Sequence, residues 1–143
     1  MKVNVVLKVK PEEFYNLMME SLEQEIKVYG KKNMTLKEGV KYKKKSSQRQ
    51  GIGSEITVYI KKLIPNKLYV STYTTSIDHT EMSYAIEKLE ESKIRVTYEE
   101  IYENVSSKEI PAWKQKMAEK KSAKNAKKML GEVEKFILNK RVK

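Results

Sequence analysis

The chain has 143 residues, no cysteine and a formal net charge of +11. This length suits one domain, residues 1–143, that buries a core without metals or disulfides, and the lack of cysteine excludes disulfides and cysteine-ligated metal sites. No apolar run approaches the roughly 20 residues that span a bilayer, and the N-terminus lacks a signal-peptide pattern. We therefore expect a cytoplasmic protein without a transmembrane segment.

The positive charge is concentrated near the C-terminus. Residues 106–143 contain 12 basic and 4 acidic side chains, whereas residues 1–105 contain 18 and 15. Such asymmetry favours an anionic partner. It also improves solubility, which needs no partner.

The first elements predicted are a strand and a helix. Residues 2–9 alternate between apolar and polar side chains, which indicates a half-buried strand. Pro11 suits the first position of a helix, and Glu12 and Glu13 suit its positive end. Apolar side chains then recur at helical spacing until Gly30, a natural stop.

The middle of the chain returns to a period of two residues. Short polar turns separate the apolar runs, so we expect an antiparallel meander. The predicted strands lie at Tyr42–Ser47, Ile56–Ile60, Leu68–Ile77, Glu81–Leu89 and Lys93–Val105.

The last predicted element is a long amphipathic helix over residues 108–139. Its apolar arc comprises Ala118, Ala123, Ala126, Met129, Leu130, Val133, Phe136 and Ile137. Lysines occupy the opposite arc, and Trp113 and Met117 fall on that lysine side. Either the helix bends or begins later than its pattern indicates, which Pro111 favours, or these two residues pack separately. The apolar arc must be buried, and the sheet is the only large candidate to cover it.

Four stretches of this sequence resemble a known superfamily: "KPEEFYNLM", "LIPNKLYVSTY", "MSYAIEKLEESKIRVTYEEIYE" and "KNAKKMLGEVEKFI". They are similar to the START-like (SRPBCC) helix-grip superfamily, which includes birch-allergen-like proteins and polyketide cyclases. Within it, they are most similar to a bacterial family of uncharacterised function. The resemblance implies an α+β fold in which a curved antiparallel sheet wraps around a long C-terminal helix. It also implies an apolar ligand between that sheet and helix, and it carries over no catalytic motif.

Alternation along the strands places most of the tyrosines on the face that the last helix would cover. Six of the nine lie there: Tyr42, Tyr69, Tyr73, Tyr84, Tyr98 and Tyr102. Converging hydroxyls in an apolar cavity suit a ligand with an apolar body and a few polar groups. The alternative is that these hydroxyls reach water at the ends of the sheet.

Glu100 falls on the same face, between Tyr98 and Tyr102. A buried carboxylate must be hydrogen-bonded or protonated. It would then act as a ligand anchor or a general base at the pocket mouth. The alternative is that a bulge turns it outward or that it lies at an open rim.

Other residue types carry little chemistry. Asp78, His79 and Glu81 are potential metal ligands, but one histidine without cysteine disfavours a metal site, and we expect no metal or cofactor. No nucleophile motif of the G-x-S-x-G type is present.

The lysine face is the remaining candidate surface for a partner. Its central members are Lys120, Lys121, Lys124, Lys127 and Lys128. Nucleic acid is disfavoured, because the face has almost no arginine and one aromatic residue. A membrane-lying helix is also disfavoured, because the apolar arc is expected to face the core.

The sequence predicts a small-ligand-binding module with a partly apolar, tyrosine-lined cavity, and disfavours an enzyme. Its partner would be a small amphipathic molecule. The cavity would include Met129 and Val133 of the last helix, with Phe136 beside them and Trp113 at an entrance. The alternatives are an enzyme of the cyclase or hydrolase type that uses the same cavity and an interaction protein that uses the lysine face.

Overall fold

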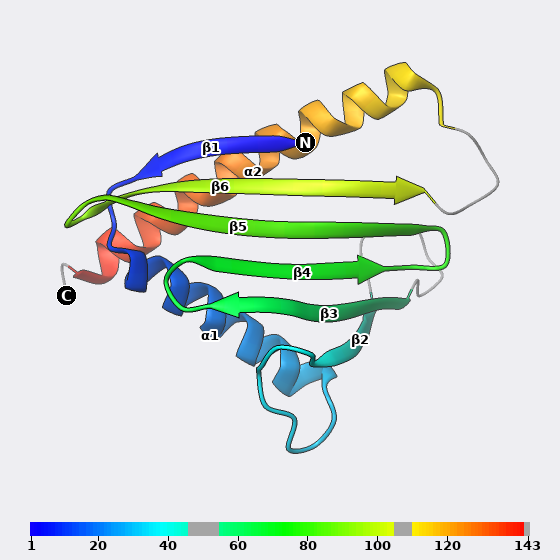
Figure 1. Cartoon of the computed structure of the whole chain (residues 1–143), viewed down its shortest axis with the longest axis horizontal. Coiled ribbons are helices and arrows are strands. Elements are labelled where there is room, and N and C mark those ends of the chain that lie inside the picture. The colour runs from blue at the N-terminus through cyan, green and yellow to red at the C-terminus, as the bar shows by residue number, and fades with distance from the viewer. Residues whose placement is uncertain (46–54, 105–109, 142–143) are drawn as a thin grey trace.

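The computed structural model describes residues 1–45, 55–104 and 110–141 of the chain. Six strands form one sheet, and two helices lie on one side of it (Figure 1). In chain order the elements are β1 (Lys2–Leu7), α1 (Pro11–Tyr29), β2 (Lys41–Lys45), β3 (Glu55–Ile64), β4 (Leu68–Thr74), β5 (Asp78–Glu90), β6 (Lys93–Asn104) and α2 (Ala112–Arg141).

The sheet is antiparallel throughout, in the order β1-β6-β5-β4-β3-β2, so β1 and β2 are its outer strands. Its register places Tyr69, Tyr84 and Tyr98 directly opposite one another on β4, β5 and β6. The next inward row joins Ser71, Met82 and Glu100. These rows form the concave face, which both helices cover.

Helix α1 begins where the sequence predicts. Pro11 is its first residue, and the Glu13 side chain accepts a hydrogen bond from the Lys10 backbone N–H at 2.8 Å. Its apolar stripe buries Phe14, Leu22 and Ile26 against the sheet. Gly30 follows the last turn, and its N–H donates to the Ile26 carbonyl at 2.7 Å.

Helix α2 packs on the sheet through its second half. Ala126, Leu130 and Ile137 are its buried residues, and Leu130 is fully excluded from solvent. Two polar contacts hold its end: the Lys8 backbone N–H donates to Glu134 at 2.6 Å, and the Arg141 guanidinium forms an ion pair with Glu13. Among the described residues, neither helix has a stretch long and apolar enough to cross a bilayer.

Three details differ from the predicted elements or extend past the described residues. Phe136 is 55% exposed, so its predicted place in the cavity is wrong. The buried side of α2 is narrower than the predicted apolar arc and is centred on Leu130 and Ile137. Helix α2 begins at Ala112 instead of residue 108, which is the later start that Pro111 favours. The predicted ends of two strands, residues 46–47 and 105, lie outside the described residues.

The contrast between Leu130 and Phe136 gives a test of how α2 is seated. We expect Leu130→Ala to lower the free energy of unfolding by about 3 kcal/mol, because it removes a buried side chain and leaves a cavity. Phe136→Ala should change it by less than about 1 kcal/mol, because that ring is mostly in water. Urea denaturation followed by circular dichroism measures both. Equal losses would contradict the observed orientation of α2.

The Arg141–Glu13 ion pair makes part of the stability depend on pH. The Arg141 guanidinium holds the pKa of the Glu13 carboxyl below its ordinary value of 4.5, although burial opposes this. A lowered folded-state pKa stabilises the fold above the unfolded-state value, and this contribution is lost as pH falls through the folded-state value.

We therefore expect Arg141→Gln to destabilise the protein at neutral pH and to have less effect at about pH 3. Urea denaturation at both pH values measures the difference. The exposed neighbour Lys140, changed to glutamine, is the matched control for loss of one positive charge. An effect of Arg141→Gln that persists undiminished in acid would exclude Glu13 as its partner.

Candidate functional site

A row of tyrosines fills the centre of the concave face. The rings of Tyr69 and Tyr84 stack with centroids 5.9 Å apart, and those of Tyr84 and Tyr98 lie 4.7 Å apart. Phe14 of α1 adds a fourth ring, 6.2 Å from Tyr84. All four side chains are buried, so this part of the predicted cavity is occupied by the protein's own rings.

Two buried hydroxyls, one in this row and one next to it, have no hydrogen-bond partner among the described residues. They belong to Tyr69 and Ser71, which are 3% and 0% exposed. Ser71 and Tyr73 are close enough to influence the Tyr69 hydroxyl, but neither forms a hydrogen bond of good geometry with it. Burial raises the pKa of Tyr69, so this hydroxyl remains protonated.

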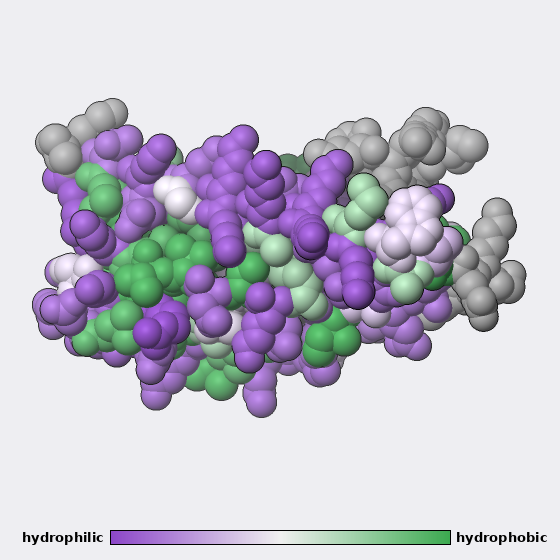
Figure 2. Space-filling model, turned by 90° about the horizontal axis from the view of Figure 1, so that it is seen from above, coloured by the Kyte–Doolittle hydropathy of each residue, from purple (hydrophilic) through white to green (hydrophobic). Residues whose placement is uncertain are grey.

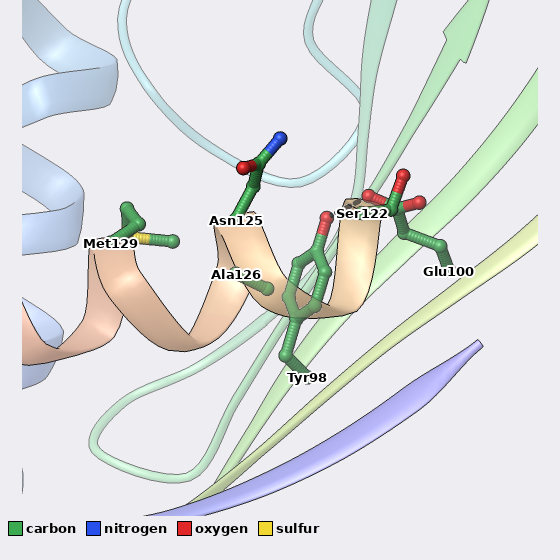
Figure 3. Close-up of a pocket in the computed structure, with 6 residues that line it drawn as sticks. All are labelled: Tyr98, Glu100, Ser122, Asn125, Ala126 and Met129. Carbon is green, nitrogen blue, oxygen red and sulfur yellow. Dashed lines mark hydrogen bonds between the residues drawn. The ribbon is translucent and has the colours of Figure 1, made fainter. Parts of the chain in front are cut away.

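A pocket of about 280 Å³ opens next to the tyrosine row, between β6 and α2 (Figure 3). The strand contributes Tyr98 and Glu100. The helix contributes the other lining residues, Ser122, Asn125, Ala126 and Met129. Their spacing of three and four residues places them on one side of α2. The lining is apolar at Ala126 and Met129 and polar at Ser122, Asn125 and Glu100, and Figure 3 places Met129 and Glu100 at opposite ends.

The polar end of the pocket is a hydrogen-bonded pair. The Tyr98 hydroxyl donates a hydrogen bond to the carboxylate of Glu100, which occupies the next inward position on the same strand (Figure 3). Burial raises the pKa of Tyr98 well above its ordinary value of 10.0, and the hydrogen bond to Glu100 raises it further. Tyr98 is thus a stable donor at neutral pH, and Glu100 faces the concave side as alternation predicts.

Tyr42 of β2 and Tyr73 of β4 take part in a group of contacts between the sheet and α1. The Tyr42 hydroxyl donates to Glu25 of α1 at 3.0 Å, and Lys44 forms an ion pair with the same carboxylate at 2.8 Å. The Lys44 ammonium also lies 5.4 Å from the centre of the Tyr73 ring. Burial and Glu25 raise the pKa of Tyr42. These contacts attach α1 to the outer strand.

The other predicted ligand-binding residues lie elsewhere. Tyr102 is 42% exposed and its hydroxyl lies 3.4 Å from Asp78, and Trp113 is 61% exposed. Val133 packs half-buried against the core. Of the predicted set, the pocket brings together Tyr98, Glu100 and Met129, and a ligand-binding role for every member stays a prediction.

Sequence reasoning missed two polar lining residues, Ser122 and Asn125. At about 100° per residue, Ser122 lies within the apolar arc of α2, between Met129 and Val133, and Asn125 lies at the edge of that arc beside the lysine arc. The arc was defined from its apolar members alone, so both polar residues were left out of the predicted lining. Their spacing from Ala126 and Met129 was the available signal, since residues three and four apart share one side of a helix.

The residues predicted for an anionic partner lie on the exposed side of α2, and the histidine considered as a metal ligand lies at the start of β5. Lys120, Lys121, Lys124, Lys127 and Lys128 are all exposed along α2. His79 Nδ1 lies 2.8 Å from the Thr74 hydroxyl. Within the described ranges, no three His, Asp or Glu side chains are grouped as metal ligands would be.

With this geometry established, comparison with known proteins gives the family. Residues 1–120 match the model of a domain of unknown function, DUF3284. The chain belongs to this family. A comparison with curated proteins finds no significant match to the sequence.

Solved structures show the same fold at low identity. An aromatase/cyclase, Zhui, from a Streptomyces species is 14% identical with a TM-score of 0.68, over 100% of this chain and 94% of that one. Ara h 8.0201 is 15% identical with a TM-score of 0.65, over 97% of each chain. A conserved protein from Geobacillus kaustophilus is 16% identical with a TM-score of 0.64, over 96% of this chain and 94% of that one. The predicted START-like helix-grip fold is thereby confirmed.

Removal of the hydroxyl should destabilise the protein at Tyr98 but not at Tyr69. We expect Tyr98→Phe to lower the free energy of unfolding by about 1–2 kcal/mol, because it deletes a hydrogen bond to a carboxylate. Tyr69→Phe should be neutral or slightly stabilising, because its hydroxyl is buried without a protein partner. Urea denaturation of the two variants decides. A loss above about 1 kcal/mol in Tyr69→Phe would show that a water or ligand satisfies this hydroxyl.

Proposed function

We propose that this DUF3284 protein is a non-catalytic module that binds a small amphipathic molecule between β6 and α2. The observation that carries the proposal is the mixed lining of the pocket, in which the apolar Ala126 and Met129 share one space with the hydrogen-bonded Tyr98–Glu100 pair. Such a lining suits a ligand with an apolar body and one hydrogen-bond donor. The START-like superfamily commonly holds ligands between its sheet and last helix, which supports the same position.

The size of the pocket restricts the ligand. Sites for drug-sized molecules usually enclose about 300–1,000 Å³, and this pocket has about 280 Å³. The stacked tyrosines occupy the space that a larger cavity would need. The ligand is therefore a single small ring system or short chain, or a longer molecule that enters by one end.

The charge of the pocket restricts the ligand further. Glu100 is the only ionisable carboxylate among its lining residues. One of its oxygens already accepts from Tyr98, and a carboxylate has capacity for further donors. A ligand hydroxyl or ammonium group satisfies that capacity, whereas a ligand carboxylate is repelled.

The Tyr98–Glu100 pair also raises a second candidate, an enzyme that uses the pair for acid–base chemistry. The pair supplies the partner for Glu100 that the sequence did not reveal. Efficient proton transfer requires a pKa near the working pH, and the pKa of Tyr98 is displaced away from it. Binding is therefore the better-supported proposal. We propose it for the chain as one domain that works in the cytoplasm.

Two measurements test the proposed binding. Native mass spectrometry of protein purified from its source should detect a small co-purifying molecule. In addition, the neutral fluorescent probe N-phenylnaphthylamine, which has apolar rings and one N–H donor, should bind with increased emission.

Pocket variants make this test specific. Ser122→Phe should abolish probe binding by filling the pocket, whereas Lys127→Phe, on the exposed side of the same helix, should not. Glu100→Gln should weaken binding about fivefold, because a neutral acceptor binds a donor about 1 kcal/mol less strongly. Glu99→Gln, its neighbour on the other face of β6, is the matched control. Probe binding that survives Ser122→Phe would refute this pocket as the site.

A further inference from the structure

The first turns of α2 extend beyond the sheet and expose apolar side chains. Every residue from Ile110 to Lys121 is exposed, and Trp113 and Met117 are 61% and 63% accessible. Figure 1 shows this part of the helix reaching past the start of β1. Figure 2, which looks onto this side of the molecule, shows pale and green surface among purple hydrophilic surface toward its right-hand end.

The exposed apolar side chains lie within a ring of lysines. Trp113 and Met117 are one helical turn apart and therefore adjacent on the outer side of α2. Lys114 and Lys121 flank them on one side, and Lys116 and Lys120 on the other. We define these six residues as the Trp113 patch. The Lys114 ammonium lies 5.6 Å from the Trp113 ring, so charge and aromatic surface are in direct contact.

We propose that the Trp113 patch binds the surface of an anionic phospholipid bilayer. Tryptophan favours the boundary between headgroups and hydrocarbon, and methionine gains by leaving water for the acyl region. Lysine stems extend along apolar surface while their ammonium groups reach lipid phosphates. Lysine residues near an anionic leaflet each strengthen binding about fivefold.

The expectation that the core occupies the apolar side of this helix holds only from Ala123 onward. Ala123, Ala126 and Leu130 pack on the sheet, whereas the turns before Ser122 make no buried contact. Membrane contact through the first turns therefore requires no unfolding of the core.

The composition of the patch favours lipid over the other anionic partners. Nucleic acid recognition uses arginine forks and several stacking rings, and the patch has one ring and no arginine. A second copy of this chain would bring an equally positive face against it. Met117, exposed beside Trp113, has a favourable environment in a bilayer and none against a phosphate backbone.

The patch and the pocket lie on different sides of α2. The pocket residues Ser122, Ala126 and Met129 face the sheet, and Trp113 and Met117 point away from it. Bilayer binding is therefore independent of the proposed ligand, and either proposal can fail alone.

The single tryptophan of the chain makes the test direct, because all tryptophan fluorescence comes from residue 113. Vesicles of phosphatidylcholine alone are compared with vesicles in which a third of the lipid is phosphatidylglycerol. We expect a blue shift of Trp113 emission and co-sedimentation with the anionic vesicles only. Brominated lipid should quench the emission, because the ring enters the interface.

Variants separate the patch from general positive charge. Lys120→Glu combined with Lys121→Glu should weaken vesicle binding roughly 25-fold or more, given about fivefold for each lysine. Lys31→Glu combined with Lys32→Glu makes the same change of charge at exposed residues before β2 and should have much less effect. Met117→Gln should reduce quenching while it leaves the net charge unchanged.

Three results would overturn the proposal. The first is no binding to anionic vesicles at low ionic strength. The second is equal loss of binding in the two lysine pairs, which would show non-specific charge attraction. The third is tighter binding to a DNA or RNA oligonucleotide than to anionic vesicles at the same salt, which would assign the patch to nucleic acid. Circular dichroism of each variant verifies that the fold is retained.

Discussion

The burial of one side of α2 in the hollow of the sheet is the constraint on which the rest of the structure depends. Only Ala126, Leu130 and Ile137 of this 30-residue helix are buried. Contacts with Lys8 and Glu13 fix its last turns beside β1 and α1. The helix is therefore held by its second half. A pocket forms where it begins to leave the sheet, and its first turns lie free.

The row of Tyr69, Tyr84 and Tyr98 explains why side chains fill much of the space between the sheet and the helices. Three tyrosines at opposed positions on adjacent strands must meet, because residues paired across a sheet lie close together. Their rings supply the apolar volume of a core, while their hydroxyls oppose full burial. Tyr42 and Tyr98 resolve this conflict with carboxylates of α1 and β6. Tyr69 has no such partner among the described residues, so the middle of the sheet retains unsatisfied polarity.

The sequence was sufficient for the fold and for the direction of strand side chains. Period-two alternation correctly placed Tyr69, Tyr84, Tyr98 and Glu100 on one face. It could not reveal whether those rings enclose space or fill it, because that depends on stacking across three strands. The helical arc was predicted too broadly, which misplaced Phe136. Ser122 lies within the apolar arc, between Met129 and Val133, and was overlooked because the arc was defined from its apolar members alone.

The outermost strand, β2, has a consequence for how the protein behaves in concentrated solution. Its five residues are four lysines and Tyr42, and it pairs with β3 alone. An outer strand otherwise offers its backbone to any other extended chain, which is a common route to aggregation. Lys41, Lys43 and Lys45 are exposed on this strand, whereas Lys44 is paired with Glu25, and the exposed ammonium groups disfavour the approach of another positively charged strand. The lysines of β2 thus protect the open side of the sheet from polymerising.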